Sequence, residues 1–109
     1  GYVLDGQEFQ ARSAREVLIN VLERLSVRDP EFLERFAGRR HGRIRRFVAK
    51  NADELYPGRP DLIQYNSHQL NSGWWVGTHY SKANIRKILQ IAGEVAGLQF
   101  GTELIVYLG

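Results

Sequence analysis

Two stretches with apolar residues at helical spacing set the strongest limits on how this chain can fold. The first begins at Ser13, which is followed by Glu16 at the spacing of a capping box, and its apolar face continues to Leu25. The second begins at Ser81, a residue type that caps helices, and ends near Gly97. Each predicted helix is apolar on one face only, so the rest of the chain must cover those faces.

The remaining segments predict short strands and one further helix. The short helix is expected between Asp29-Pro30, a pattern typical of a helix start, and Gly38, which ends it. Strands are expected at residues 2–10, as a hairpin around Asp5-Gly6, and at residues 43–50, 62–65, 74–78 and 104–108. The mixture predicts an α+β fold, in which a small and mainly antiparallel sheet packs with about three helices.

Length and composition predict one domain and no membrane span. With 109 residues, 43% of them hydrophobic, the chain can bury a single core. No apolar run approaches the roughly 20 residues that cross a bilayer, and the absence of cysteine excludes disulfides and thiolate metal sites. We therefore expect a cytoplasmic protein. The chain begins at Gly1-Tyr2 and contains no methionine, which predicts a domain cut from a longer protein whose other domains are its partners.

The segment from Arg35 to Lys50 concentrates the positive charge. It holds seven of the chain's 15 Lys and Arg residues and no acid, whereas the remainder of the chain carries more acids than bases. Such an island suggests a polyanion partner, and a solvated arginine-rich turn is the alternative. The residues of this segment expected to contact DNA phosphates are Arg39, Arg40, Arg43, Arg45 and Arg46.

A polar loop at the start of the last helix is the second candidate segment. Its side chains offer hydrogen-bond donors, acceptors and a stackable ring suited to base edges. Cations crowd the first turns of the helix, where they oppose the macrodipole unless an anion lies nearby. The alternative is a simple corner with a capping serine. The expected base-reading residues are His79, Tyr80, Ser81 and Asn84, and the expected phosphate contacts are Lys82, Arg86 and Lys87.

Enzymatic chemistry finds little support in the sequence. The three histidines, His41, His68 and His79, are scattered without the spacing of a metal-ligand pair, and no glycine-rich phosphate loop occurs. His79 and Ser81 lie two apart on an extended segment, where they do not meet as base and nucleophile. The basic segment contains no carboxylate that could hold magnesium. We therefore expect no catalytic residue, no metal site and no cofactor.

Residues 41–49 (HGRIRRFVA), 74–78 (WWVGT) and 85–89 (IRKIL) form a series of short motifs. The series resembles the C-terminal DNA-binding domain of the SeqA family, replication-sequestration proteins that recognise hemimethylated GATC, over roughly residues 15–92. The resemblance implies that Arg43 and Arg45 contact the phosphate backbone and that the loop from His79 to Lys82 enters the major groove. It also implies association with a bacterial or phage nucleoid. The family's loop is rich in Asn and Thr, so its base-reading residues do not carry over to this chain.

These observations lead to one hypothesis and two alternatives. The hypothesis is a non-catalytic, double-stranded DNA-binding module that reads modified bases within a larger replication-control or restriction protein. The first alternative is a protein-interaction or homo-oligomerisation module that uses the edge strand 104–108 and an exposed tryptophan. The second is an RNA-binding domain whose base-stacking residues are Phe47, Trp74, Trp75 and Tyr80.

Overall fold

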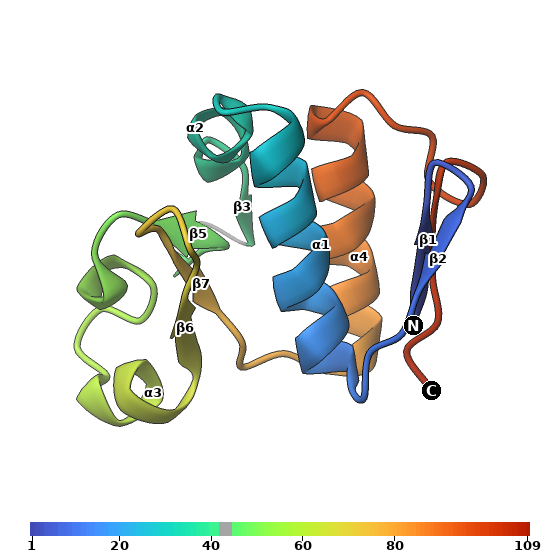
Figure 1. Cartoon of the computed structure of the whole chain (residues 1–109). Helices are drawn as coiled ribbons and strands as arrows, with labels where there is room; N and C mark the ends of the chain where they lie inside the picture. Colours follow the sequence, from blue (N-terminus) through green and yellow to red (C-terminus); the bar gives the residue numbers. More distant parts are fainter. Residues whose placement is uncertain (42–44) are drawn as a thin grey trace.

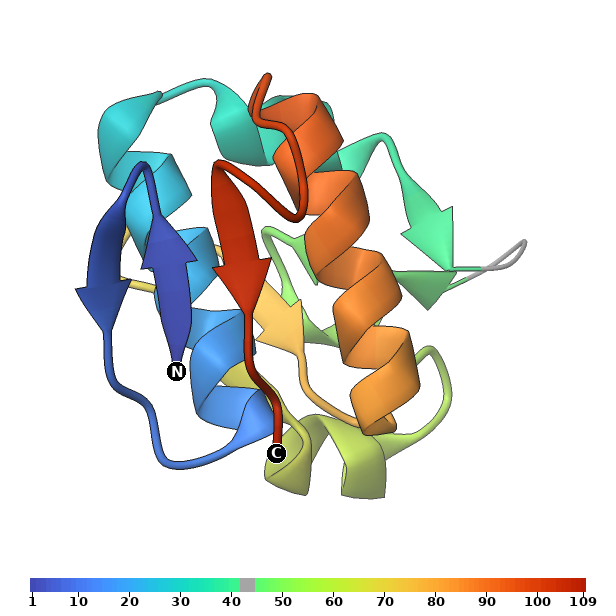
Figure 2. The same ribbon diagram turned by 90° about the vertical axis from the view of Figure 1, so that its right-hand side faces the viewer.

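Two long helices lie side by side and run in the same direction through the centre of the fold (Figures 1 and 2). The computed structural model describes residues 1–41 and 45–109. Helix α1 (Ala14–Arg28) begins after Ser13, whose hydroxyl accepts a hydrogen bond from the Glu16 amide at 3.1 Å. Helix α4 (Lys82–Val95) begins after Ser81, which accepts the Asn84 amide at 3.2 Å. Both predicted N-caps are therefore confirmed.

A three-stranded antiparallel sheet lies on one side of the helix pair (Figure 1). Its strands are β1 (Tyr2–Leu4), β2 (Gln7–Phe9) and β8 (Leu104–Val106), in the order β2-β1-β8. The hairpin predicted around Asp5-Gly6 is present, and both turn residues have positive φ, as hairpin turns of two residues require. Gly1 and Tyr107 exchange two main-chain hydrogen bonds, which places the ends of the described chain next to each other.

A second three-stranded antiparallel sheet lies on the other side of the helices. Its strands are β5 (Val48–Ala49), β7 (Trp75–Gly77) and β6 (Ser67–Gln69), in the order β5-β7-β6. Helix α2 (Phe32–Ala37) joins it to the helix pair through three stacked rings, in which Phe36 lies between Phe32 and Phe47. The strands β3 (Arg40–His41) and β4 (Arg45–Arg46) pair with each other only.

Residues 52–65 form an outer layer over the sheet β5-β7-β6. They contain the 3-10 helix η1 (Ala52–Glu54) and the helix α3 (Pro60–Tyr65). Their apolar side chains make a second, smaller core, whose buried members are Ala49, Leu55, Tyr56 and Leu62, while Trp75 packs against it from the sheet. In the part of the chain that is described, no helix is long and apolar enough to span a membrane.

The α+β class is confirmed, and three local expectations need correction. Residues 62–65 form the end of helix α3 instead of a strand, because Pro60 starts a helix in which Leu62 alone is buried. The strand expected at residues 43–50 is interrupted: β4 ends at Arg46, Phe47 turns into the core, and β5 joins a different sheet, while residues 43 and 44 lie outside the described residues. Helix α2 begins at Phe32, because the Asp29 carboxylate accepts the Glu31 amide in a turn before it.

Two valines of α1 give a matched test of where the core lies. Val21 is fully buried, whereas Val27 is 85% exposed. Val21→Ala should lower the free energy of unfolding by about 2 kcal/mol, because two buried methyl groups are lost and a cavity remains. Val27→Ala should change it by less than about 0.5 kcal/mol. Chemical denaturation of both variants measures the difference, and equal losses would contradict this packing.

Candidate nucleic-acid interface

The pairing of β5 with β7 brings the two predicted DNA-binding segments together. Val48 lies opposite Val76, and the Gly77 amide donates to the Phe47 carbonyl at 3.1 Å. Phe47 lies at the start of this paired segment, directly before β5, and Gly77 lies at the end of β7. The β3–β4 ribbon and the loop of residues 78–81 therefore leave the sheet at the same place, although more than 30 residues separate them in the sequence.

A buried tyrosine from the outer layer fixes the main chain at this junction. Tyr56 is 2% exposed, and its hydroxyl accepts the His79 amide at 3.0 Å. Gly77 allows this approach, because a Cβ at that position would lie 2.8 Å from the Tyr56 hydroxyl and 3.3 Å from that of Tyr80. The start of the loop is thus held by a hydrogen bond and by close packing. The sequence around Tyr56 contains no local pattern that would indicate this role.

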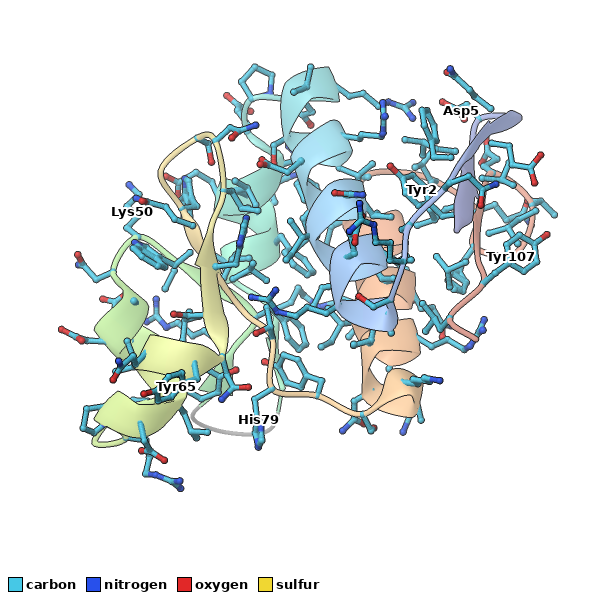
Figure 3. All side chains as sticks on the ribbon, turned by 60° about the horizontal axis from the view of Figure 1, so that its bottom comes forward. Tyr2, Asp5, Lys50, Tyr65, His79 and Tyr107 are labelled. Atoms are coloured by element: carbon cyan, nitrogen blue, oxygen red, sulfur yellow. The ribbon has the colours of Figure 1, made fainter. Side chains whose placement is uncertain are left out.

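The predicted base-reading residues have different environments. His79 is exposed, and its side chain points away from the fold on the same face as Tyr65 (Figure 3). Tyr80 is half-buried and packs against the main core, so its ring is not freely available for stacking. Ser81 is occupied as the N-cap of α4, and Asn84 is half-buried in the first turn. Of this set, His79 has the geometry best suited to contact a ligand.

The basic segment meets acids that other elements bring to it. Arg39 contacts Glu94 of α4 at 3.3 Å, and Arg46 contacts Glu54 of η1 at 3.9 Å. Further pairs join Arg35 to Asp29 at 2.5 Å and Lys50 to Glu34 at 3.2 Å. Arg40 and Arg45 are placed by the pairing of β3 with β4, and Arg43 lies outside the described residues. Exposed pairs of this kind contribute little to stability, so phosphates can compete for these cations.

The three cations at the start of α4 separate into two groups. Lys82 donates to the Gly109 carbonyl at 3.2 Å and Arg86 to the Val106 carbonyl at 3.4 Å, so both hold the end of the chain. Lys87 lies seven residues before Glu94, and therefore on the helix face whose far end meets Arg39. In Figure 2 the β3–β4 ribbon projects beside α4, on the side away from β1 and β2. Lys87 is the α4 cation best placed to share a ligand with the ribbon.

The ion pair before α2 gives a prediction about pH. The hydrogen bond from Arg35 lowers the pKa of Asp29 below its ordinary value. A lowered folded-state pKa adds stability above the unfolded-state pKa, and this stability is lost as pH falls through the folded-state value. Asp29→Asn should therefore destabilise the protein at neutral pH, and its effect should shrink as the pH falls toward about 2, because the carboxyl becomes protonated. Denaturation at both pH values measures this, with Asp53→Asn as the control for removing an exposed carboxylate elsewhere.

The junction gives a second prediction. Tyr56→Phe keeps the buried ring but removes the acceptor of the His79 amide, which should cost about 1 kcal/mol and speed hydrogen exchange at that amide. Tyr65→Phe is the matched control, because Tyr65 is 72% exposed. Amide exchange followed by NMR distinguishes the two variants. Unchanged exchange at His79 in Tyr56→Phe would show that the bond does not hold the loop.

Within the described residues, no group of three or more His, Asp or Glu side chains could hold a metal ion. Comparisons with known proteins found no matching family model and no similar curated protein or solved structure.

Proposed function

We propose that this chain is a non-catalytic domain that binds double-stranded DNA. The observation that carries the proposal is the shared exit of the β3–β4 ribbon and the loop of residues 78–81 from the β5–β7 pair. A ribbon rich in arginine can follow the phosphate backbone, while a polar loop beside it can reach a groove. Phosphate binding and base reading need this proximity, because phosphate contacts fix the register in which bases are read.

The electrostatics of the interface support a phosphate-binding role. The exposed pairs Arg39–Glu94 and Arg46–Glu54 keep these guanidiniums at the surface. A guanidinium can exchange one exposed carboxylate for a phosphate at little cost. Lys87 adds a charge on the adjoining face of α4. Binding of this type releases counterions, so affinity should fall steeply as salt increases.

We assign the reading of bases, including modified bases, to the loop around His79. Its imidazole is exposed, while its main-chain amide is held by Tyr56. A fixed main chain with an exposed polar side chain suits discrimination between base edges, because a loosely held loop would average over several partners. The resemblance to the SeqA family supports entry of this loop into the major groove, whereas the assignment of His79 rests on its own geometry. In this proposal the domain directs a larger replication-control or restriction protein of the bacterial or phage cytoplasm to its DNA.

The RNA-binding alternative has less support. Phe47 is 1% exposed, and Trp75 packs against the outer core. Trp74 is half-buried, and the Lys50 ammonium lies 5.4 Å from its ring centre. These rings therefore do not form one open stacking platform, which single-stranded RNA would require.

Fluorescence polarisation tests the proposal with unmodified, hemimethylated and fully methylated duplexes of one sequence, beside single-stranded RNA. Lys87→Gln should weaken binding to every duplex by a similar factor, about threefold to tenfold at low salt. Arg28→Gln is the matched control, because it removes the same charge on the β1–β2 side of the fold. A wild-type domain that binds no duplex at low salt would refute the proposal.

His79→Ala should act differently from Lys87→Gln. Because the loop reads bases in this proposal, the variant should change the ratio of affinities among the three duplexes by about fivefold or more. Its dependence on salt should stay close to that of the wild type, since no phosphate contact is removed. An unchanged ratio, with normal binding, would move base reading away from this loop.

A further inference from the structure

The two edges of the sheet β2-β1-β8 differ in how they are covered. At the β8 edge, the Leu104 amide donates to the Gln99 carbonyl at 3.2 Å, and the Leu104 carbonyl accepts the Gly101 amide at 2.7 Å. Arg86 covers the next carbonyl along this edge, that of Val106, at 3.4 Å. The chain therefore blocks its own β8 edge, as proteins commonly do to prevent unwanted strand pairing.

The β2 edge has no such cover. Gly1 exchanges two hydrogen bonds with Tyr107, so in the alternating antiparallel pattern Val3 directs its main-chain N–H and C=O groups toward β8. Tyr2 and Leu4 direct theirs toward β2. The amide and carbonyl of Glu8 consequently point away from β1. Among the described residues, neither group has a hydrogen-bond partner. One donor and one acceptor are thus available to an added strand.

A groove lies between this sheet and the exposed face of α1. Its volume is about 970 Å³, and the apolar side chains of Phe9, Ile19 and Val27 contribute to its lining. His68 and Asn71, from the β6–β7 hairpin, line its opposite wall. In Figure 1 this face of α1 lies toward the viewer between the two sheets. A fourth strand beside β2 would cover the part of α1 that the present sheet leaves open.

One arginine in the groove is held in position with its donor edge available. The guanidinium carbon of Arg24 lies 3.5 Å from the ring centre of Phe9, and its Nε donates to the Tyr2 hydroxyl at 2.6 Å. Its two terminal nitrogens have no partner among the described residues. The neighbouring Glu23 carboxylate already accepts the Asn71 amide. A planar fork fixed in this way matches a carboxylate, to which it can donate two parallel bonds.

The remaining charges of the groove do not compete for this position. Arg28 is paired with Asp5 at 2.6 Å beside the hairpin turn. Arg15 and Glu16 lie together in the first turn of α1, two turns away from Arg24. The local positive charge next to the free edge is therefore that of Arg24.

We propose that this groove binds an extended peptide segment that carries an Asp or Glu side chain. The segment adds to β2 as a fourth strand, bonds the main chain of Glu8, places apolar side chains on Ile19 and Val27, and presents its carboxylate to Arg24. The site lies on the side of the fold away from the β3–β4 ribbon (Figure 2) and is independent of the proposed DNA binding. It would let the domain hold another protein segment while its other face is occupied.

A defined peptide tests the proposal. The probe is a blocked, fluorescein-labelled heptapeptide with the sequence Thr-Val-Thr-Asp-Thr-Val-Thr, in which the valines and the aspartate share one face of an extended strand, beside the same peptide with asparagine. The protein variants are Glu8→Pro, which removes the edge amide, and Glu8→Ala, which keeps it. Proline is tolerated at a sheet edge, and thermal denaturation checks that both variants remain folded. Arg24→Gln tests the carboxylate contact, and Arg12→Gln is the matched charge control outside the groove.

The aspartate peptide should bind the wild type about tenfold more tightly than the asparagine peptide. Glu8→Pro should weaken both peptides by about tenfold, Glu8→Ala should bind like the wild type, and Arg24→Gln should remove the difference between the peptides. Absence of saturable binding to the folded wild type, or equal losses in the two Glu8 variants, would overturn the proposal. Self-association that Glu8→Pro abolishes would instead make a second copy the occupant, and would also overturn it.

Discussion

The packing of α1 against α4 supports every other part of this structure. Each strand of the two three-stranded sheets is two or three residues long, and such small sheets have little stability alone. Both rest on the helix pair, and their inward side chains join one continuous core with it. Leu18, Leu22 and Leu89 are completely buried in that core. The helix pair thus acts as the middle layer, and the sheets acquire order from contact with it.

This arrangement explains why the two faces of the molecule can differ in chemistry. The face around the β5–β7 pair is built from segments distant in sequence, and charged contacts such as Arg39–Glu94 and Arg46–Glu54 connect them. The face around β1 and β2 is built mainly from the first residues of the chain and α1, with His68 and Asn71 of the β6–β7 hairpin at its margin. Because the middle layer separates them, a change of side chain on one face need not disturb the other. The changes in the free energy of unfolding caused by substitutions on the two faces should therefore add.

The sequence predicts those features that depend on neighbours along the chain. The caps Ser13 and Ser81, the Asp5-Gly6 turn and the apolar faces of the long helices are local patterns, and all were correctly predicted. Residues 62–65 were misassigned because an isolated run of apolar residues fits a strand or a helix equally, and Pro60 decided between them. The contact between Tyr56 and His79 spans 23 residues. No local pattern reports such a contact.

The same limit applies to the charges of the candidate interface. The basic segment contains no acid of its own, so the sequence suggested an unbalanced cluster. Glu34, Glu54 and Glu94 reach it only when α2, η1 and α4 are packed around it. Lys82 and Arg86 were likewise expected to meet phosphates, yet both bond carbonyl groups near the end of the chain. Long-range packing therefore decides which of the cations stay available.

The bonds between Gly1 and Tyr107 have a mechanical consequence. β1 and β8 are antiparallel neighbours, and the two ends of the described chain meet at one end of their ladder. Tension applied to both ends would break the hydrogen bonds between β1 and β8 one after another, in the unzipping geometry. It would not load all of these bonds together, as the shear geometry does. The sheet β2-β1-β8 would thus yield at low force, whereas the helix pair and the face around β5 and β7 would still be folded. Within a longer protein, pulling on this domain would first expose the edge of β1.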